Sequence, residues 1–252
     1  DAPEAGCGIV VVPSAQDFQQ YAEETADQLM NYVWGKRHEF HYTGLTREPQ
    51  EALQAALDFS GKPVFLTDSG DNVTSGAMGA NTFILRQVLA CEHLTKRFLF
   101  AAINDSAVYQ LLEAHDVQEQ VHLRLGMDMD ECTAAVELDV TILAKGRQKG
   151  THMYGEDGDY GGLVSVSVKD KPITIVVTDN NHSFVEKHQM DACGIDWDDY
   201  DVIVVKQGYI HPELKEKGKL CIMSLTDGAT LQDTKRIPFK LIMRPIYPLD
   251  DM

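Results

Sequence analysis

The chain has 252 residues, of which 44% are hydrophobic and 24% charged, values typical of a globular protein rather than a disordered one. Its 39 acidic residues outnumber its 22 basic ones, and the formal net charge of −17 argues against binding to nucleic acid or to an anionic membrane. The sequence has no apolar run of about 18 residues, so it predicts no membrane-spanning helix. Five cysteines without a C-x-x-C pair predict reduced thiols and a cytoplasmic location.

The N-terminal part of the chain predicts alternating strands and helices. An apolar run at residues 8–13 predicts a buried strand, and Ser14-Ala15-Gln16-Asp17 resembles a capping box that begins a helix with one apolar face. The elements expected next are a helix over 46–59, a strand over 63–66, a helix over 82–94, a strand over 97–103, and a helix over 105–114 that is capped by Asn104 or Asp105. Strands and helices that alternate at this spacing imply a parallel sheet.

The middle of the chain has a different pattern. Strands are expected over 121–125, 134–145, 163–169 and 173–178, and the alternation of apolar and polar residues in the second is typical of a half-exposed antiparallel strand. Residues 145–162 predict a long polar loop, and 183–192 a helix, before strands at 202–205 and 220–224. The sequence therefore predicts one α/β domain over 1–252, with a mostly parallel sheet flanked by helices and an antiparallel β-rich insertion at about 120–180.

Residues 67–81 are the most informative segment of the chain. They lie between the expected strand at 63–66 and the expected helix at 82–94, and they are rich in Asp, Asn, Ser, Thr and Gly. A loop of this composition after a parallel strand is a common place for ligand-binding groups, because glycine permits close backbone approach and the helix start favours anions. The alternative is a turn-rich connection, since the same residue types favour turns.

This loop also resembles a known family. Asp68-Ser69-Gly70-Asp71-Asn72, followed by Gly76-Ala77-Met78-Gly79, is similar to a signature of the microcystinase C family of proposed zinc metallopeptidases, in its C-terminal region. The segments Val204-Val205-Lys206-Gln207-Gly208-Tyr209, Pro212-Glu213-Leu214 and Arg244-Pro245-Ile246-Tyr247-Pro248-Leu249-Asp250 resemble the closing blocks of that family. The family commonly has Asp at the position of Asn81, where this chain has no carboxylate.

The resemblance implies that a longer protein would carry this chain as its C-terminal half. The metal-bearing N-terminal half, with the His and acidic ligands for zinc, would precede it, and this chain alone would bind no metal and show little catalysis. On this view the chain is a truncated or processed piece, and the missing half is its partner.

Two interpretations of the loop remain open. In the functional one, Asp68, Asp71 and Asn72 are catalytic: the carboxylates receive a substrate amine or orient a metal-bound water, and Asn72 holds a carbonyl. Thr74, Ser75, Gly76, Asn81 and Lys206 would then contact the substrate. In the structural one, the two aspartates cap the loop and helix, and Lys206 pairs with them. The functional interpretation predicts that Asp71→Ala and Asn72→Ala abolish catalysis while leaving the melting temperature nearly unchanged.

The sequence offers no complete metal site. The nine histidines form no H-E-x-x-H motif, and the pair His38 and His41 would share a face only on a helix. His211 stands alone before a proline and is interpreted as a surface residue. G-x-S-x-G and G-x-x-x-x-G-K motifs are also absent.

The expected function is therefore the C-terminal part of a metallopeptidase that hydrolyses amide bonds of small or linear peptides, with this part supplying a loop of the substrate cleft. One alternative is a different amidohydrolase that reuses the loop. The other is a non-catalytic ligand-binding or assembly module, and a homo-oligomer remains compatible with all three. The physiological substrate and the metal are left open.

Overall fold

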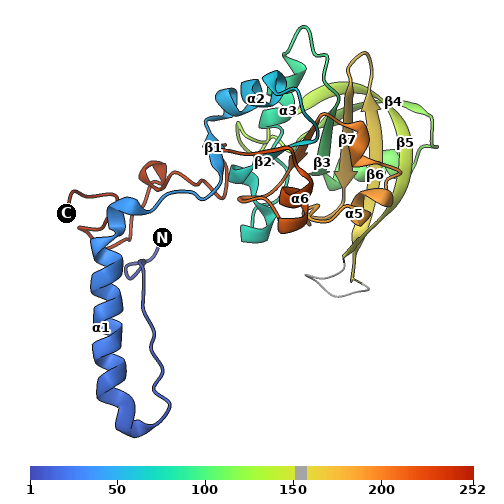
Figure 1. Ribbon diagram of the computed structural model, residues 1–252. Coiled ribbons are helices and arrows are strands. Elements are labelled where there is room, and N and C mark those ends of the chain that lie inside the picture. Colours follow the sequence, from blue (N-terminus) through green and yellow to red (C-terminus); the bar gives the residue numbers. More distant parts are fainter. Residues whose placement is uncertain (151–157) are drawn as a thin grey trace. The chain divides into compact units, whose positions relative to one another are not determined.

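The computed structural model describes residues 1–150 and 158–252, which form two compact units (Figure 1). Residues 44–232 form one unit, and residues 1–43 together with 233–252 form the other. That the whole chain behaves as one domain stays a prediction. Within the described ranges, no helix is long and apolar enough to cross a membrane.

A nine-stranded sheet organises the larger unit. The strands are β1 (Leu45–Arg47), β2 (Val64–Asp68), β3 (Phe98–Asn104), β4 (Gln120–Leu125), β5 (Val136–Gly150), β6 (Gly158–Val168), β7 (Ile173–Thr178), β8 (Val202–Val205) and β9 (Leu220–Ser224). Their order is β1-β9-β2-β8-β3-β7-β6-β5-β4. Neighbours from β1 to β7 in this order are parallel, whereas β7, β6, β5 and β4 pair antiparallel. The predicted α/β fold with an antiparallel insertion is confirmed.

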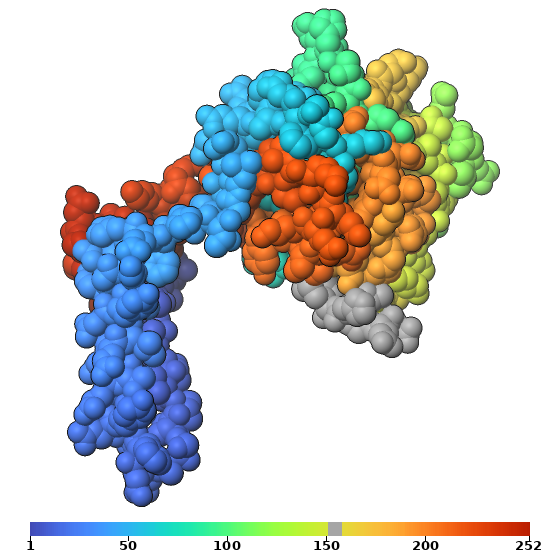
Figure 2. Space-filling view, in the orientation of Figure 1, coloured from blue at the N-terminus to red at the C-terminus, as the bar shows by residue number. Residues whose placement is uncertain are grey.

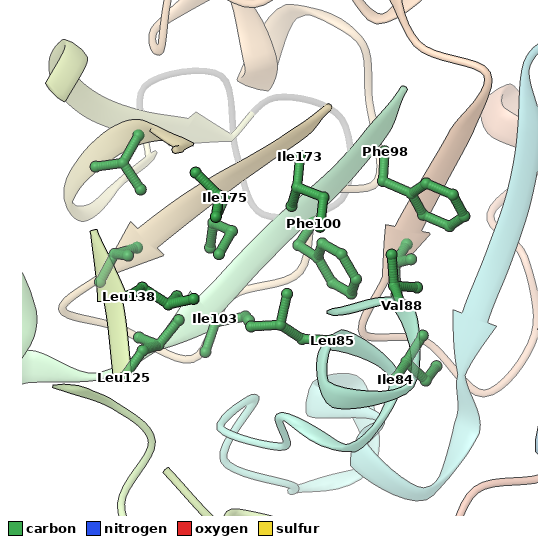
Figure 3. Close-up of a cluster of buried hydrophobic side chains, with 14 of the residues drawn as sticks. Ile84, Leu85, Val88, Phe98, Phe100, Ile103, Leu125, Leu138, Ile173 and Ile175 are labelled. Atoms are coloured by element: carbon green, nitrogen blue, oxygen red, sulfur yellow. The ribbon is translucent and has the colours of Figure 1, made fainter. Parts of the chain in front are cut away.

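Helices cover both faces of the sheet. Helices α2 (Pro49–Asp58), α3 (Phe83–Leu89) and α4 (Ser106–Glu113) pack on one face, and the short helices α5 (His188–Asp191) and α6 (Pro212–Lys217) pack on the other (Figure 1). Successive residues of a parallel strand therefore enter two different cores. Phe98 and Phe100 of β3 pack under α3 (Figure 3), whereas Leu99 lies in the cluster that contains Trp197.

A side-chain cap begins α4, as predicted. Asp105 accepts a hydrogen bond from the Val108 amide at 3.1 Å through Oδ1, and its Oδ2 accepts one from the Gly126 amide at 3.0 Å. One carboxylate thus fixes the helix start and ties the segment after β4 to it.

The smaller unit is largely exposed. Its helix α1 (Gln19–Gly35) buries only Ala22, while Tyr21 is 68% exposed and Tyr32 64% exposed (blue in Figure 2). The two chain ends are joined because the carboxylate of Asp1 accepts hydrogen bonds from the amides of residues 240–242.

Two predictions at the N-terminus are wrong. Residues 8–13 pair with no strand among the described residues, and Val10 and Val12 are 87% and 82% exposed, because an apolar run cannot form a strand without a neighbouring one. The proposed capping box at 14–17 is a 3-10 turn, Gln16–Phe18, and neither Ala15 nor Phe18 makes a side-chain cap.

Other boundaries shift for physical reasons. The expected helices at 82–94 and 183–192 shorten to α3 and α5, and the first two residues of the expected helix at 46–59 belong to the edge strand β1. Part of the polar loop expected at 145–162 is strand instead, because Arg147 and Lys149 reach Asp159 across the β5–β6 pair. These strand residues form charged cross-strand pairs and lack the alternating apolar residues by which a strand is recognised in a sequence. Residues 151–157 lie outside the described residues.

Candidate functional site

Three neighbouring parallel strands end at the same edge of the sheet. Strand β2 pairs with β8 on one side and with β9 on the other, so their carboxyl ends lie together. Asp68 is the last residue of β2, Lys206 follows β8, and Thr226 lies two residues beyond β9. This is the edge where open α/β sheets place their binding sites.

A buried cluster of charges lies at this edge. Lys206 Nζ is 2.8 Å from Asp68 Oδ2 and 3.0 Å from Asp71 Oδ2, and it donates a hydrogen bond to the Asn81 carbonyl oxygen at 2.6 Å. All three charged side chains are at least 96% buried. Burial acts to lower the pKa of Lys206, but the two carboxylates outweigh it and hold that pKa above its usual value. The lysine is therefore charged.

Asp71 fixes the second half of the loop. Its Oδ1 accepts a hydrogen bond from the Gly79 amide at 2.8 Å, and its Oδ2 accepts one from the Asn81 amide at 2.8 Å. The first half is held from the other side, where the Thr226 hydroxyl donates to Asp68 and accepts from the Gly70 amide at 2.9 Å. Each carboxylate is thus saturated by groups of the protein itself.

Asn72 shapes the turn that leaves this cluster. Its Oδ1 accepts hydrogen bonds from the amide and the hydroxyl of Thr74, at 3.1 and 2.7 Å, and its Nδ2 donates to Ser75 Oγ at 2.9 Å. Gly76 ends the turn with a φ of +97°, a conformation that favours glycine. A Cβ on Gly208 would lie 2.7 Å from Asn72 Nδ2, so glycine there allows the two segments to touch.

An open pocket of about 770 Å³ lies beside this turn. Its walls come from residues 73–75 after β2, residues 181–185 after β7, and residues 207–212 after β8. All three segments follow the carboxyl ends of parallel strands, and all belong to the larger unit. The volume lies in the range of small-ligand sites, roughly 300–1,000 Å³.

The pocket wall combines polar and apolar side chains. Gln207 is committed to the protein, because its Nε2 donates to the Phe184 carbonyl at 2.8 Å and its Oε1 accepts from the His211 amide at 2.9 Å. The imidazole of His211 has no hydrogen-bond partner among the described residues, and its Nδ1 is buried. Burial lowers the pKa of His182, which also lines the pocket.

The predicted site residues occupy two layers. Thr74 and Ser75 line the pocket, whereas Asp68, Asp71, Asn81 and Lys206 form the buried cluster and Asn72 links the two. Gly76 supplies the turn. The pairing of Lys206 with both aspartates, which the sequence left as an alternative, is present.

Among the pocket residues that sequence reasoning missed are both of its histidines, His182 and His211. His211 was interpreted as an isolated surface residue. The one available signal was its position, five residues after Lys206 at a strand end that the sequence had already placed beside the loop.

The residues present do not fit a metal ion. The described ranges contain no group of three or more His, Cys, Asp or Glu side chains that could hold one. Asp68 and Asp71 are already paired with Lys206, and Asp71 also accepts hydrogen bonds from two backbone amides. His38 and His41 are both exposed, and His38 lies in a 3-10 turn that does not continue to His41.

Comparisons with known proteins agree with the sequence resemblance. A family model described as "MlrC C-terminus" matches residues 66–241. The structure is similar to a crystal structure of a protein from Mesorhizobium sp. BNC1, named "Putative metallopeptidase", with a TM-score of 0.74 and 22% sequence identity. The match covers 92% of this chain and 46% of that one, so this chain spans less than half of its length. The search of curated proteins gave no match.

Proposed function

Because this chain belongs to the MlrC C-terminus family, we propose that it is the C-terminal part of a metallopeptidase that hydrolyses amide bonds in small or linear peptides. In this proposal the chain forms one wall of the substrate cleft. The observation that carries it is the open pocket of about 770 Å³, whose wall includes residues 73–75 of the loop that carries the family's signature.

The two layers of the site support separate roles. Thr74 and Ser75 face the pocket and would contact the peptide. Asp68, Asp71, Asn81 and Lys206 are buried and bound to one another, which supports a role in positioning the loop more than direct contact with a substrate. A catalytic role for Asp68, Asp71 and Asn72 remains a prediction.

Metal chemistry would come from outside this chain. Its described residues do not fit a metal, whereas the similar structure is named a metallopeptidase and is about twice as long as this chain. Zinc bound by an N-terminal half would supply an activated water, and this chain would bind and orient the peptide. A cytoplasmic location is supported by five unpaired cysteines.

The smaller unit supports packing against further protein. Large apolar side chains along α1 and the segment before it are exposed, among them Tyr21, Tyr32 and Trp34. Exposed apolar patches usually mark interaction surfaces. We propose that an N-terminal half of the same protein covers them, with a second copy of the chain as the alternative.

The decisive experiment compares this chain with the full-length natural protein that contains it. Zinc content would be measured by mass spectrometry, and hydrolysis would be followed with a panel of linear peptides. Stoichiometric zinc and hydrolysis only in the full-length protein would support the proposal. Saturable peptide binding without turnover under any metal condition would instead establish a binding module.

A pocket-filling variant tests the role of this chain within that protein. Ser75→Trp should raise KM at least about tenfold while zinc content and kcat change little, because the bulk would occupy the peptide site and leave the metal untouched. The matched control is Ser106→Trp, at an exposed position in α4 outside the pocket. Equal KM values for the two variants would show that the pocket is not part of the peptide-binding cleft.

A further inference from the structure

The pocket is uncharged in a strongly acidic chain. Although the chain has a formal net charge of −17, none of the described residues lining the pocket is Asp, Glu, Lys or Arg. Its polar groups are hydroxyls, carboxamides and two imidazoles, and burial lowers the pKa of one of these, His182. A ligand with a full charge would find no partner of opposite sign there, and charged groups are costly to desolvate without one.

The charged groups of the signature loop are unavailable to a ligand. Asp68 and Asp71 are buried within the signature loop, and Lys206 pairs with both of them at 2.8 and 3.0 Å. A substrate amine would have to displace this lysine, and a substrate carboxylate would have to displace one of the aspartates. Recognition of a peptide terminus by these residues is therefore disfavoured.

Two side chains of the pocket have unused hydrogen-bonding capacity. Ser75 Oγ accepts from Asn72 Nδ2 at 2.9 Å, and no described residue accepts the Ser75 hydroxyl proton. The His211 imidazole has no partner among those residues, and leaving its Nδ1 buried and unpaired is unfavourable. Since neutral imidazole has one donor and one acceptor nitrogen, it is matched by a ligand that offers both kinds of group.

A peptide backbone amide offers both a hydrogen-bond donor and an acceptor, and it carries no charge. We propose that the pocket binds an internal, uncharged segment of a peptide, with the Ser75 hydroxyl donating to a backbone carbonyl and the His211 imidazole, turned about its side-chain torsion, pairing with an adjacent amide. Tyr209, which is 79% exposed at the rim, would cover the segment. This inference rests on the proposed peptidase function, for which it names the substrate class: peptides held by interior residues, not by their ends.

The test is a titration of the isotopically labelled chain at pH 8, followed by amide chemical shifts. The probes are N-acetyl-dialanine N-methylamide, which has no charge, and zwitterionic dialanine. The capped peptide should shift the amides of residues 73–75 and 207–211 saturably. Dialanine should bind at least tenfold more weakly.

Matched variants connect the binding to the two side chains. Ser75→Ala and His211→Phe should each weaken binding of the capped peptide roughly 2–10-fold, the loss of one hydrogen bond. Ser106→Ala and His93→Phe change the same residue types at exposed positions outside the pocket, and they should have no effect. Amide shifts elsewhere in the spectrum report whether each variant is folded.

Two results would overturn the inference: tighter binding of dialanine than of the capped peptide, or equal affinity of Ser75→Ala, His211→Phe and the unchanged chain. Neither depends on hydrolysis. A pocket that binds the capped peptide in a full-length protein without peptidase activity would retain this inference and remove the proposed function. Peptide hydrolysis by a full-length protein whose pocket prefers charged termini would support the proposed function and overturn this inference.

Discussion

Replacing Lys206 with methionine should strongly destabilise the larger unit, because it leaves Asp68 and Asp71 buried without a cation. At an effective dielectric constant of about 20, each contact near 3 Å contributes roughly 5 kcal/mol of attraction, offset by several kcal/mol for desolvating each ion. Removing one partner of such a buried group typically costs about 3–5 kcal/mol. We expect a loss of that size in the free energy of unfolding at pH 7.

The loss should depend on pH in a defined direction. Burial already raises the pKa of Asp68 in the unchanged protein, and losing Lys206, which acts to lower that pKa, would raise it further. A carboxyl group whose pKa is higher in the folded than in the unfolded state destabilises the fold at every pH at which it is ionised. The loss of unfolding free energy is therefore complete at neutral pH and becomes smaller as the pH falls towards about 4. At each pH, the comparison is with the unchanged protein.

Urea unfolding followed by tryptophan fluorescence measures this loss. The chain has two tryptophans, and Trp197 is buried against Phe65 in the larger unit, with a ring-centroid distance of 5.6 Å, whereas Trp34 is exposed in the smaller one. A Trp34→Phe background therefore restricts the signal to the larger unit. Adding Asp68→Asn to Lys206→Met should recover part of the loss, since only one charge then remains buried. A loss below about 1 kcal/mol that is independent of pH would refute the reasoning.

Three further predictions concern other parts of the larger unit. Gly70→Ala should lower the free energy of unfolding in urea by about 1–3 kcal/mol, because the added Cβ would lie 2.3 Å from the Asp227 carbonyl oxygen. The control Gly44→Ala should be neutral, because no atom lies within 4 Å of the added Cβ. Equal effects of the two substitutions would contradict the close contact at Gly70. Ala102 has a φ of +76°, so Ala102→Gly should leave the melting temperature nearly unchanged. Ala102→Val should lower the free energy of unfolding by about 2 kcal/mol or more. A valine variant as stable as the unchanged protein would disprove the left-handed conformation. Burial, together with Asp130, raises the pKa of Cys132 to about 11. Cys132 should therefore be alkylated at least about 100-fold more slowly than glutathione at pH 8, as measured by peptide mass spectrometry. A rate close to that of glutathione would show that the pKa of Cys132 is not raised.

The sequence predicted those parts of the fold in which local chemistry and tertiary structure agree. Strand β8 matches its expected range, 202–205, because its four apolar residues are all buried, and Asp105 caps α4 because capping depends on only three neighbouring residues. The strand at 8–13 failed for the opposite reason. Apolar residues form a strand only beside another strand, and local sequence carries no information about that neighbour.

The site divides in the same way. The signature loop was recognisable from its composition and its position after β2, but the buried state of Asp68 and Asp71 was not, because it depends on Lys206 and Thr226, which are distant in sequence. This changes one expectation. Asp71→Ala would leave Lys206 and the amides of Gly79 and Asn81 without a partner, so we now expect a clear fall in melting temperature.

The buried cluster of Asp68, Asp71 and Lys206 also constrains how this family can diverge. Replacing Lys206 alone leaves two buried carboxylates without a cation, whereas replacing one aspartate leaves a matched pair, so a lineage that loses the lysine first must pass through a destabilised intermediate. The lysine should therefore be lost only after, or together with, an aspartate. Relatives that lack the lysine should also have replaced at least one aspartate, even where their pocket residues and substrates differ.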